Sequence, residues 1–127
     1  MKIISIFIAL TVALMATGFS AAAAEKPGKI YHVVSFKFKD TATPEQIKEV
    51  EKAFKALKGK IREIKSLEWG TNISPEKLNK GFTHAWVLTF NSEKDRDAYL
   101  VHPAHKAFGS SLGPVLGDVF VVDFKAE

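Results

Sequence analysis

The stretch Ile30–Lys39, which reads IYHVVSFKFK, decides the fold of this chain. Its side chains alternate with a period of two and are rich in β-branched and aromatic types, which predicts a β-strand. One face is apolar except for a single histidine and consists of Ile30, His32, Val34, Phe36 and Phe38. Val33 on the opposite face is apolar as well. The strand therefore needs apolar cover on both of its faces.

A helix is expected to follow this strand. Thr43 stands where an N-cap belongs, Pro44 at the first helical position, and Gln46 where a capping box needs its amide. Apolar residues then recur at spacings of three and four, which predicts one stripe packed on a core. They are Ile47, Val50, Phe54, Leu57, Ile61 and Ile64. Gly59 is expected to mark the end of the regular helix.

Three further strands are predicted along the chain. Ser66–Thr71 places Leu67 and Trp69 at strand spacing, and a polar connection follows it. Phe82–Phe90 is the clearest strand, with His84 and Trp86 on the face that carries its large apolar side chains. Val119–Phe124 is the last strand.

A broken helix is expected around Tyr99–His105, which reads YLVHPAH and holds two of the four histidines and one of the two tyrosines. Ser92 can cap its first part. Pro103 cannot donate a backbone hydrogen bond and disfavours helical geometry before it, so a second short helix should run over Pro103–Leu112. Because the two helices meet at a corner, the side chains of the tyrosine and both histidines can point toward the same place. The alternative interpretation is that they are packing residues satisfied by backbone groups.

The order strand, helix, strand, strand, broken helix, strand predicts a single α+β domain. We expect a ferredoxin-like, four-stranded antiparallel sheet with helices on one face. Ala85 and Val87 are apolar on the second face of their strand, as Val33 is on its own. Helices can cover only one side of the sheet, and a two-fold homodimer is the commonest way to cover the other.

The N-terminus has the architecture of a secretory signal peptide. A basic start at Met1-Lys2 precedes an apolar run over Ile3–Met15, which is too short for a membrane span of about 20 residues. Four alanines at 21–24 then offer a cleavage site. We expect residues 1–24 to be removed and residues 25–127 to form an exported domain, periplasmic or secreted, without a membrane anchor. A retained N-terminal anchor is the alternative.

Charge and cysteine content exclude several classes of function. The formal net charge is +4, and the basic residues are scattered among acids, so no nucleic-acid partner is expected. The chain has no cysteine, which excludes disulfides, thiol catalysis and zinc–thiolate sites. Stability must therefore come from core packing or from oligomerisation.

Four segments carry a resemblance to a known family: HVVSFKFK at 32–39, GFTHA at 81–85, YLVHPAH at 99–105 and VVDF at 121–124. They are similar to the stress-responsive dimeric α/β-barrel (Dabb) family. The resemblance implies a ferredoxin-like protomer whose sheet pairs with a second copy to close a barrel. Some plant members are induced by stress, and some members are polyketide cyclases that promote an aldol closure. In those cyclases a tyrosine and the last histidine of the motif form the acid–base pair, which implies Tyr99 and His105 as catalytic residues here.

The residue pattern also predicts a ligand pocket. His32 and His84 each lie on an apolar strand face, and His105 opens a helix that should cover that face. The other expected pocket residues are His102, Phe36, Trp86 and Phe108, with Phe38 nearby. Imidazole exchanges protons near neutral pH, and a phenol can donate a hydrogen bond to a developing enolate. We therefore expect binding of a small apolar or carbonyl-containing molecule, with cyclase-type catalysis as an alternative.

Two other interpretations stay open. His102 and His105 at i, i+3 could share a metal, and related dimeric barrels bind haem, but no nearby carboxylate completes a ligand set. We therefore expect no metal and no cofactor. The last alternative is a structural dimer whose histidines lie in the core without a ligand.

Overall fold

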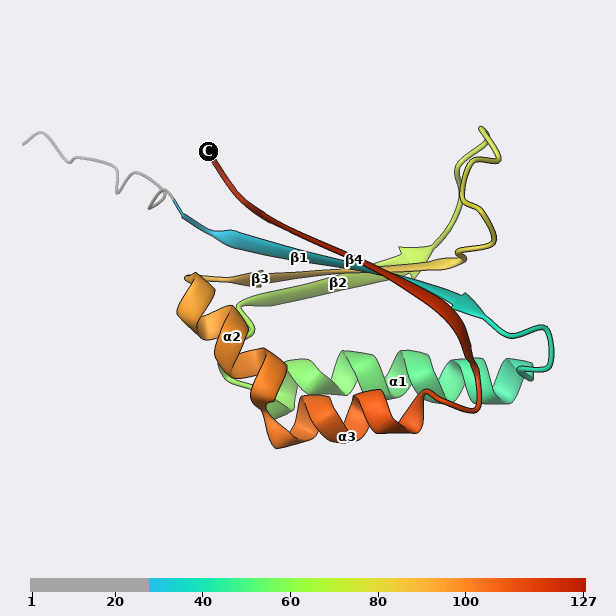
Figure 1. Ribbon diagram of the computed structural model, residues 1–127, viewed down its shortest axis with the longest axis horizontal. Coiled ribbons are helices and arrows are strands. Elements are labelled where there is room, and N and C mark those ends of the chain that lie inside the picture. The colour runs from blue at the N-terminus through green and yellow to red at the C-terminus, as the bar shows by residue number, and fades with distance from the viewer. Residues whose placement is uncertain (1–27) are drawn as a thin grey trace, which may run out of the picture.

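The computed structural model describes residues 28–127, and this part contains four strands and three helices in the predicted order (Figure 1). They are β1 (Ile30–Phe38), α1 (Pro44–Lys60), β2 (Ser66–Thr71), β3 (His84–Phe90), α2 (Glu93–Val101), α3 (Pro103–Ser111) and β4 (Leu116–Lys125). The predicted signal peptide, residues 1–24, lies outside the described residues. No helix within residues 28–127 has the length and apolarity needed to cross a membrane.

The strands form one antiparallel sheet in the order β2-β3-β1-β4. β1 lies inside the sheet, where Val34 is paired with Trp86 of β3 and with Val121 of β4. All three helices lie on one side of the sheet (Figure 1). The ferredoxin-like α+β fold predicted from the sequence is therefore confirmed.

Helix α1 begins with the predicted capping box. Thr43 Oγ1 accepts a hydrogen bond from the Gln46 N–H at 3.2 Å, and the Gln46 side chain accepts one from the Thr43 N–H at 2.8 Å. Gly59 does not end the helix, which continues to Lys60. A glycine inside a helix costs about 1 kcal/mol relative to alanine. The apolar stripe opposes that cost by burying Val50, Phe54 and Leu57 against the core.

Two strands have bounds that differ from the prediction. β3 begins at His84 rather than at Phe82, because the Phe82 N–H donates to the Asn79 carbonyl in the preceding loop at 2.8 Å. β4 is longer than predicted, because it pairs with β1 along the whole of Leu116–Lys125, with one irregularity near Phe38.

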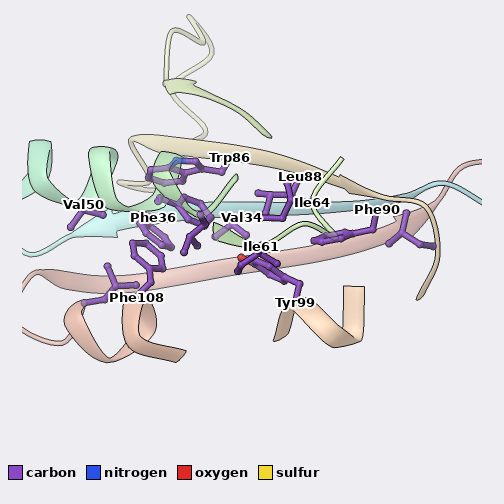
Figure 2. Packing of buried hydrophobic residues seen from close by; sticks show 14 of the residues in the cluster. Val34, Phe36, Val50, Ile61, Ile64, Trp86, Leu88, Phe90, Tyr99 and Phe108 are labelled. Carbon is purple, nitrogen blue, oxygen red and sulfur yellow. The ribbon is translucent and has the colours of Figure 1, made fainter. Parts of the chain in front are cut away.

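The core lies between the sheet and the helices (Figure 2). Phe54 of α1 stacks on Phe108 of α3, with ring centroids 4.8 Å apart and 2° between the ring planes. Trp86 of β3 is fully buried and lies 4.7 Å from the Phe54 ring. This aromatic cluster joins two helices to the sheet.

The opposite side of the sheet, here called the outer face, carries no helix among the described residues (Figure 1). Its apolar residues are Tyr31, Val33, Ala85, Val87, Phe120, Val122 and Phe124. Phe120, Val122 and Phe124 are 54%, 42% and 49% exposed. The two-sided apolar pattern of the sequence thus leaves one face of the sheet without cover from residues 28–127.

Candidate functional site

The break between α2 and α3 separates two backbone groups that a continuous helix would pair. Without Pro103, the Leu100 carbonyl would accept a hydrogen bond from the Ala104 N–H. Instead, His105 Nδ1 donates to the Leu100 carbonyl at 3.1 Å, and the Ala104 N–H donates to His102 Nδ1 at 3.0 Å. The two histidines of the motif therefore supply hydrogen-bond partners for the two backbone groups that the break leaves unpaired. Each imidazole ring is held in place by its Nδ1 contact.

A cavity of about 230 Å³ lies between this helix corner and the sheet. The Tyr99 ring stands between two imidazoles, with its centroid 4.4 Å from that of His105 and 5.6 Å from that of His32. Most of the wall is apolar, and it includes Phe54 and Val121. Of the site residues predicted from the sequence, the structure brings five to this cavity: His32, Phe36, Tyr99, His105 and Phe108.

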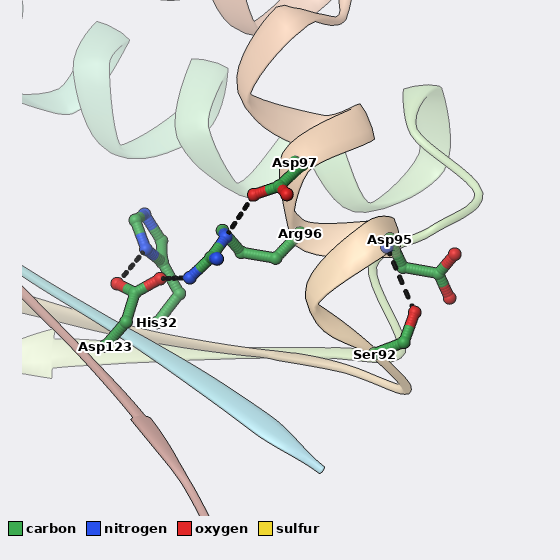
Figure 3. Close-up of polar contacts among 6 residues, drawn as sticks. All are labelled: His32, Ser92, Asp95, Arg96, Asp97 and Asp123. Atoms are coloured by element: carbon green, nitrogen blue, oxygen red, sulfur yellow. Dashed lines mark hydrogen bonds and ion pairs between the residues drawn. The ribbon is translucent and has the colours of Figure 1, made fainter. Parts of the chain in front are cut away.

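A chain of charged side chains holds His32 (Figure 3). His32 Nδ1 donates to Asp123 Oδ1 at 2.6 Å, and Arg96 of α2 donates to Asp123 Oδ2 at 2.6 Å and to Asp97 at 2.7 Å. Burial alone would raise the pKa of Asp123, but the hydrogen bonds from Arg96 and His32 outweigh it, and the pKa is lowered. His32 and Asp123 are paired across β1 and β4, so the sheet register itself places the carboxylate beside the imidazole.

Burial shifts the pKa values of the two central groups. It raises the pKa of Tyr99 well above its ordinary value, and the negative charge of Asp123 adds to the shift. It lowers the pKa of His105, although the hydrogen bond to the Leu100 carbonyl opposes the change, and two nearby histidines lower it further. At neutral pH Tyr99 is therefore an un-ionised phenol, and His105 is a neutral imidazole whose Nε2 can accept a proton.

His84 does not line this cavity, which corrects the expectation from the sequence. The register pairs His84 with Phe36, whereas Leu88 lies opposite His32. The two histidines are therefore about 13 Å apart along the sheet, at roughly 3.3 Å per residue. Alternation with a period of two predicts the shared face of the sheet correctly, but it does not give the position along that face.

His102 and Trp86 also lie outside the cavity. The His102 ring is held at the N-terminus of α3, where it accepts from the Ala104 N–H. Trp86 is fully buried, and its Nε1–H has no hydrogen-bond partner within the described residues. Phe38 packs edge-on against His84, with ring centroids 5.0 Å apart, rather than against Tyr99. These residues support the structure around the site instead of facing the cavity.

The sequence interpretation missed three side chains that hold the histidines: Asp123, Arg96 and Glu51, which contacts His84 at 2.8 Å. One signal was available, because Asp123 is the single acid in the otherwise apolar stretch 119–124 and shares the helix-covered face with Val121. Arg96 and Glu51 gave no comparable signal, since charged residues are ordinary on the solvated side of a helix.

By their spacing in the sequence, His102 and His105 could form a metal-binding pair. Each uses its Nδ1 atom in a hydrogen bond with a backbone group. No group of three or more histidine, aspartate or glutamate side chains within residues 28–127 could hold a metal ion.

Comparison with known proteins identifies the family. The family model of the stress responsive A/B barrel domain, Dabb, matches residues 30–126. The chain belongs to the Dabb family. HS1 of Arabidopsis thaliana, a stress-response A/B barrel domain-containing protein, is 37% identical to it over 101 residues, which cover 80% of this chain and 93% of HS1. Olivetolic acid cyclase of Cannabis sativa is 34% identical over 95 residues, covering 75% of this chain and 94% of the cyclase.

Solved structures agree with the Dabb assignment. The hydroxynitrile lyase of Passiflora edulis matches with a TM-score of 0.75 and 26% identity, covering 80% of this chain and 95% of the lyase. A dimeric ferredoxin-like protein of unknown function from Thermobifida fusca matches with a TM-score of 0.68 and 30% identity, covering 79% of this chain and 92% of that protein. Proteins similar to this Dabb chain thus include enzymes and dimers.

Proposed function

We propose that this Dabb protein binds a small carbonyl-containing molecule in the cavity of His32, Tyr99 and His105 and exchanges protons with it. The observation that carries the proposal is the position of the Tyr99 phenol between two imidazoles in a cavity with apolar walls. The cavity volume, about 230 Å³, is below the range of about 300–1,000 Å³ that is usual for drug-sized ligands. The ligand is therefore a small one.

Each polar group of the cavity has a distinct role in this proposal. The Tyr99 hydroxyl keeps its proton because its pKa is raised, so it can donate a hydrogen bond to a carbonyl oxygen. Nδ1 of His105 is used on the Leu100 carbonyl, so Nε2 is the base for a proton on the carbon next to that carbonyl. His32, held by Asp123, presents a second imidazole to the same cavity. Removal of the proton gives an enolate, which Tyr99 stabilises.

The relatives support catalysis on this fold, since one is a cyclase and another a hydroxynitrile lyase. We test the function with acetophenone, an apolar methyl ketone, by following deuterium incorporation next to its carbonyl in D2O by NMR. His105→Ala should slow the protein-dependent exchange by about 100-fold, because a positioned base contributes about 10²–10⁴-fold. Tyr99→Phe removes a single hydroxyl and should slow it by about tenfold.

His102→Asn is the matched control for this experiment. Asparagine keeps a side-chain acceptor for the N-terminus of α3 and removes a histidine that does not face the cavity. His102 contributes to the lowered pKa of His105, so the comparison is made above the ordinary histidine range, where His105 is neutral in both proteins and exchange should be unchanged. The pH profile gives a second readout. Because burial lowers the pKa of His105, exchange should fall on acidification only below the ordinary histidine range. Exchange that persists in His105→Ala would contradict the proposal.

A homodimer formed through the outer face completes the proposed arrangement. This face is apolar, and its β4 side chains are about half exposed. The similar protein from Thermobifida fusca is dimeric, and so is a ferredoxin-like relative from Bacteroides fragilis that is 29% identical with a TM-score of 0.63. A two-fold contact would place the same face of both copies together and close a barrel.

Export of this protein remains a prediction from residues 1–24. Protein recovered from the cell envelope or the medium of a producing cell should have the intact mass of a chain that starts at Glu25. An exported chain with the mass of the full sequence from Met1 would show that no leader is removed.

A further inference from the structure

A second cavity, of about 520 Å³, lies on the side of the sheet opposite Tyr99. Its floor is one end of the outer face and includes Ser35, Ala85 and Phe120. The irregular segment 72–83 rises over this end of the sheet (Figure 1) and contributes Leu78 to the wall. The function proposed above makes no use of this larger cavity.

A chain of three polar side chains reaches this cavity from the helix side of the sheet. Glu51 Oε1 lies 2.8 Å from His84 Nε2, and Thr83 Oγ1 lies 2.8 Å from His84 Nδ1. His84 is only 7% exposed, whereas Thr83 is exposed, and both line the cavity. The chain therefore links a carboxylate on α1 to a hydroxyl on the far side of the sheet.

The direction of these hydrogen bonds follows from the carboxylate. An ionised carboxylate can only accept, so His84 Nε2 donates to Glu51, and Nδ1 of the neutral ring accepts from the Thr83 hydroxyl. The Thr83 oxygen then has lone pairs left to accept a hydrogen bond from a ligand. A ligand that suits this site is a hydrogen-bond donor.

The other lining residues indicate what further chemical groups a ligand of this cavity would carry. Phe82 and Leu78 supply apolar walls, and Phe120 adds an aromatic ring to the floor. Lys80 supplies a positive charge, and no acidic side chain lines the cavity within the described part of the chain. This combination favours a molecule with an apolar body and a hydroxyl group that can become negatively charged.

We propose that this cavity binds a small, mainly apolar molecule with an acidic hydroxyl, a phenol or an enol, and that Thr83 helps to ionise it. The ligand hydroxyl donates to Thr83 Oγ1. Its proton passes to Thr83 while the Thr83 proton passes to His84 Nδ1. The products are a ligand anion beside Lys80 and an imidazolium beside the Glu51 carboxylate, and no other reactant is needed.

The same three side chains also hold α1 against β3, so the test must separate that structural role from ligand binding. Thr83→Val does so, because it removes one hydroxyl from an exposed side chain and leaves the Glu51–His84 contact in place. Thr83→Ser restores the hydroxyl. Thr71→Val is the matched control, since Thr71 lines the same cavity but the His84 ring is bonded to Thr83 and Glu51 instead.

The probe is p-nitrophenol, whose phenolate form absorbs visible light. Wild-type protein should bind it and increase the phenolate absorbance at a pH below the pKa of the free phenol. Thr83→Val should weaken binding by about tenfold and remove the added absorbance, as expected for one lost hydrogen bond to a charged ligand. Thr83→Ser, Thr71→Val and His105→Ala should each remain within about twofold of wild type.

Several outcomes would overturn the proposal. They are absence of p-nitrophenol binding to the wild type, equal binding by Thr83→Val, and loss of binding in His105→Ala rather than in Thr83→Val. The last result would place the phenol in the Tyr99 cavity. Phe120 belongs to the outer face as well, so binding is measured over a range of protein concentrations. An affinity that falls as the dimer forms would mean that the second copy fills the cavity.

Discussion

Val122→Lys should convert the protein from a dimer into a monomer at micromolar concentration. Val122 is 42% exposed on the outer face and is paired with Val33 of β1. Phe120 and Phe124 flank it on the same face of β4. In a two-fold dimer a lysine at this position, and its symmetry mate, would bury two ammonium groups in an apolar contact. We expect the dimer dissociation constant to rise by about 100-fold or more.

The monomeric variant should still be folded. A lysine on an exposed edge strand is well tolerated when no partner covers it. Light scattering measures the oligomeric state, and circular dichroism checks the fold. Val101→Lys on α2 is the control. Val101 is 64% exposed and does not belong to the outer face. The dimer is excluded if the wild type is monomeric at micromolar concentration, and its location is wrong if Val122→Lys remains dimeric.

Phe54→Ala should reduce the free energy of unfolding by about 3–5 kcal/mol. The Phe54 side chain is 2% exposed and packs against the rings of Phe108, Trp86 and Phe36, at centroid distances of 4.8, 4.7 and 5.8 Å. Phe54 therefore packs α1 against both α3 and the sheet. Its removal leaves a void that rings held by other backbone elements cannot fill.

Urea denaturation of both proteins at the same protomer concentration measures this effect, because dimer formation links stability to concentration. Lys55→Ala is the control. It changes the adjacent, exposed position of the same helix and should alter stability by no more than about 0.5 kcal/mol. A loss below about 1 kcal/mol for Phe54→Ala would mean that the aromatic cluster is not the centre of the core.

The sequence alone determined the elements, their order and their buried faces. Alternation in Ile30–Lys39 predicted a strand with two apolar faces, and the structure has β1 inside the sheet with a covered and an uncovered side. The capping box at Thr43 and the break at Pro103 lie where they were predicted. These features are local, because they depend on spacing and on the backbone chemistry of a few neighbouring residues. That is why they could be predicted without the fold.

The composition of the site was only partly predictable. His32, Tyr99 and His105 were expected to meet, and the structure brings them to one cavity. His84 was expected there too, but it lies four positions further along the sheet and contacts Glu51 instead. Periodicity predicts the face of a strand to which a side chain points. It carries no information about which residue of the next strand lies opposite.

Only the tertiary structure decided the partners of the histidines. Asp123 lies beside His32 because β4 pairs with β1 in one particular register, and that register depends on packing over the whole sheet. Glu51 meets His84 because the fold brings this part of α1 within hydrogen-bond distance of the first residue of β3. Such contacts join residues far apart in the chain, so no local pattern specifies them. The hydrogen-bond partners that fix each imidazole, and with them the chemistry available to it, therefore emerge only when the chain is folded.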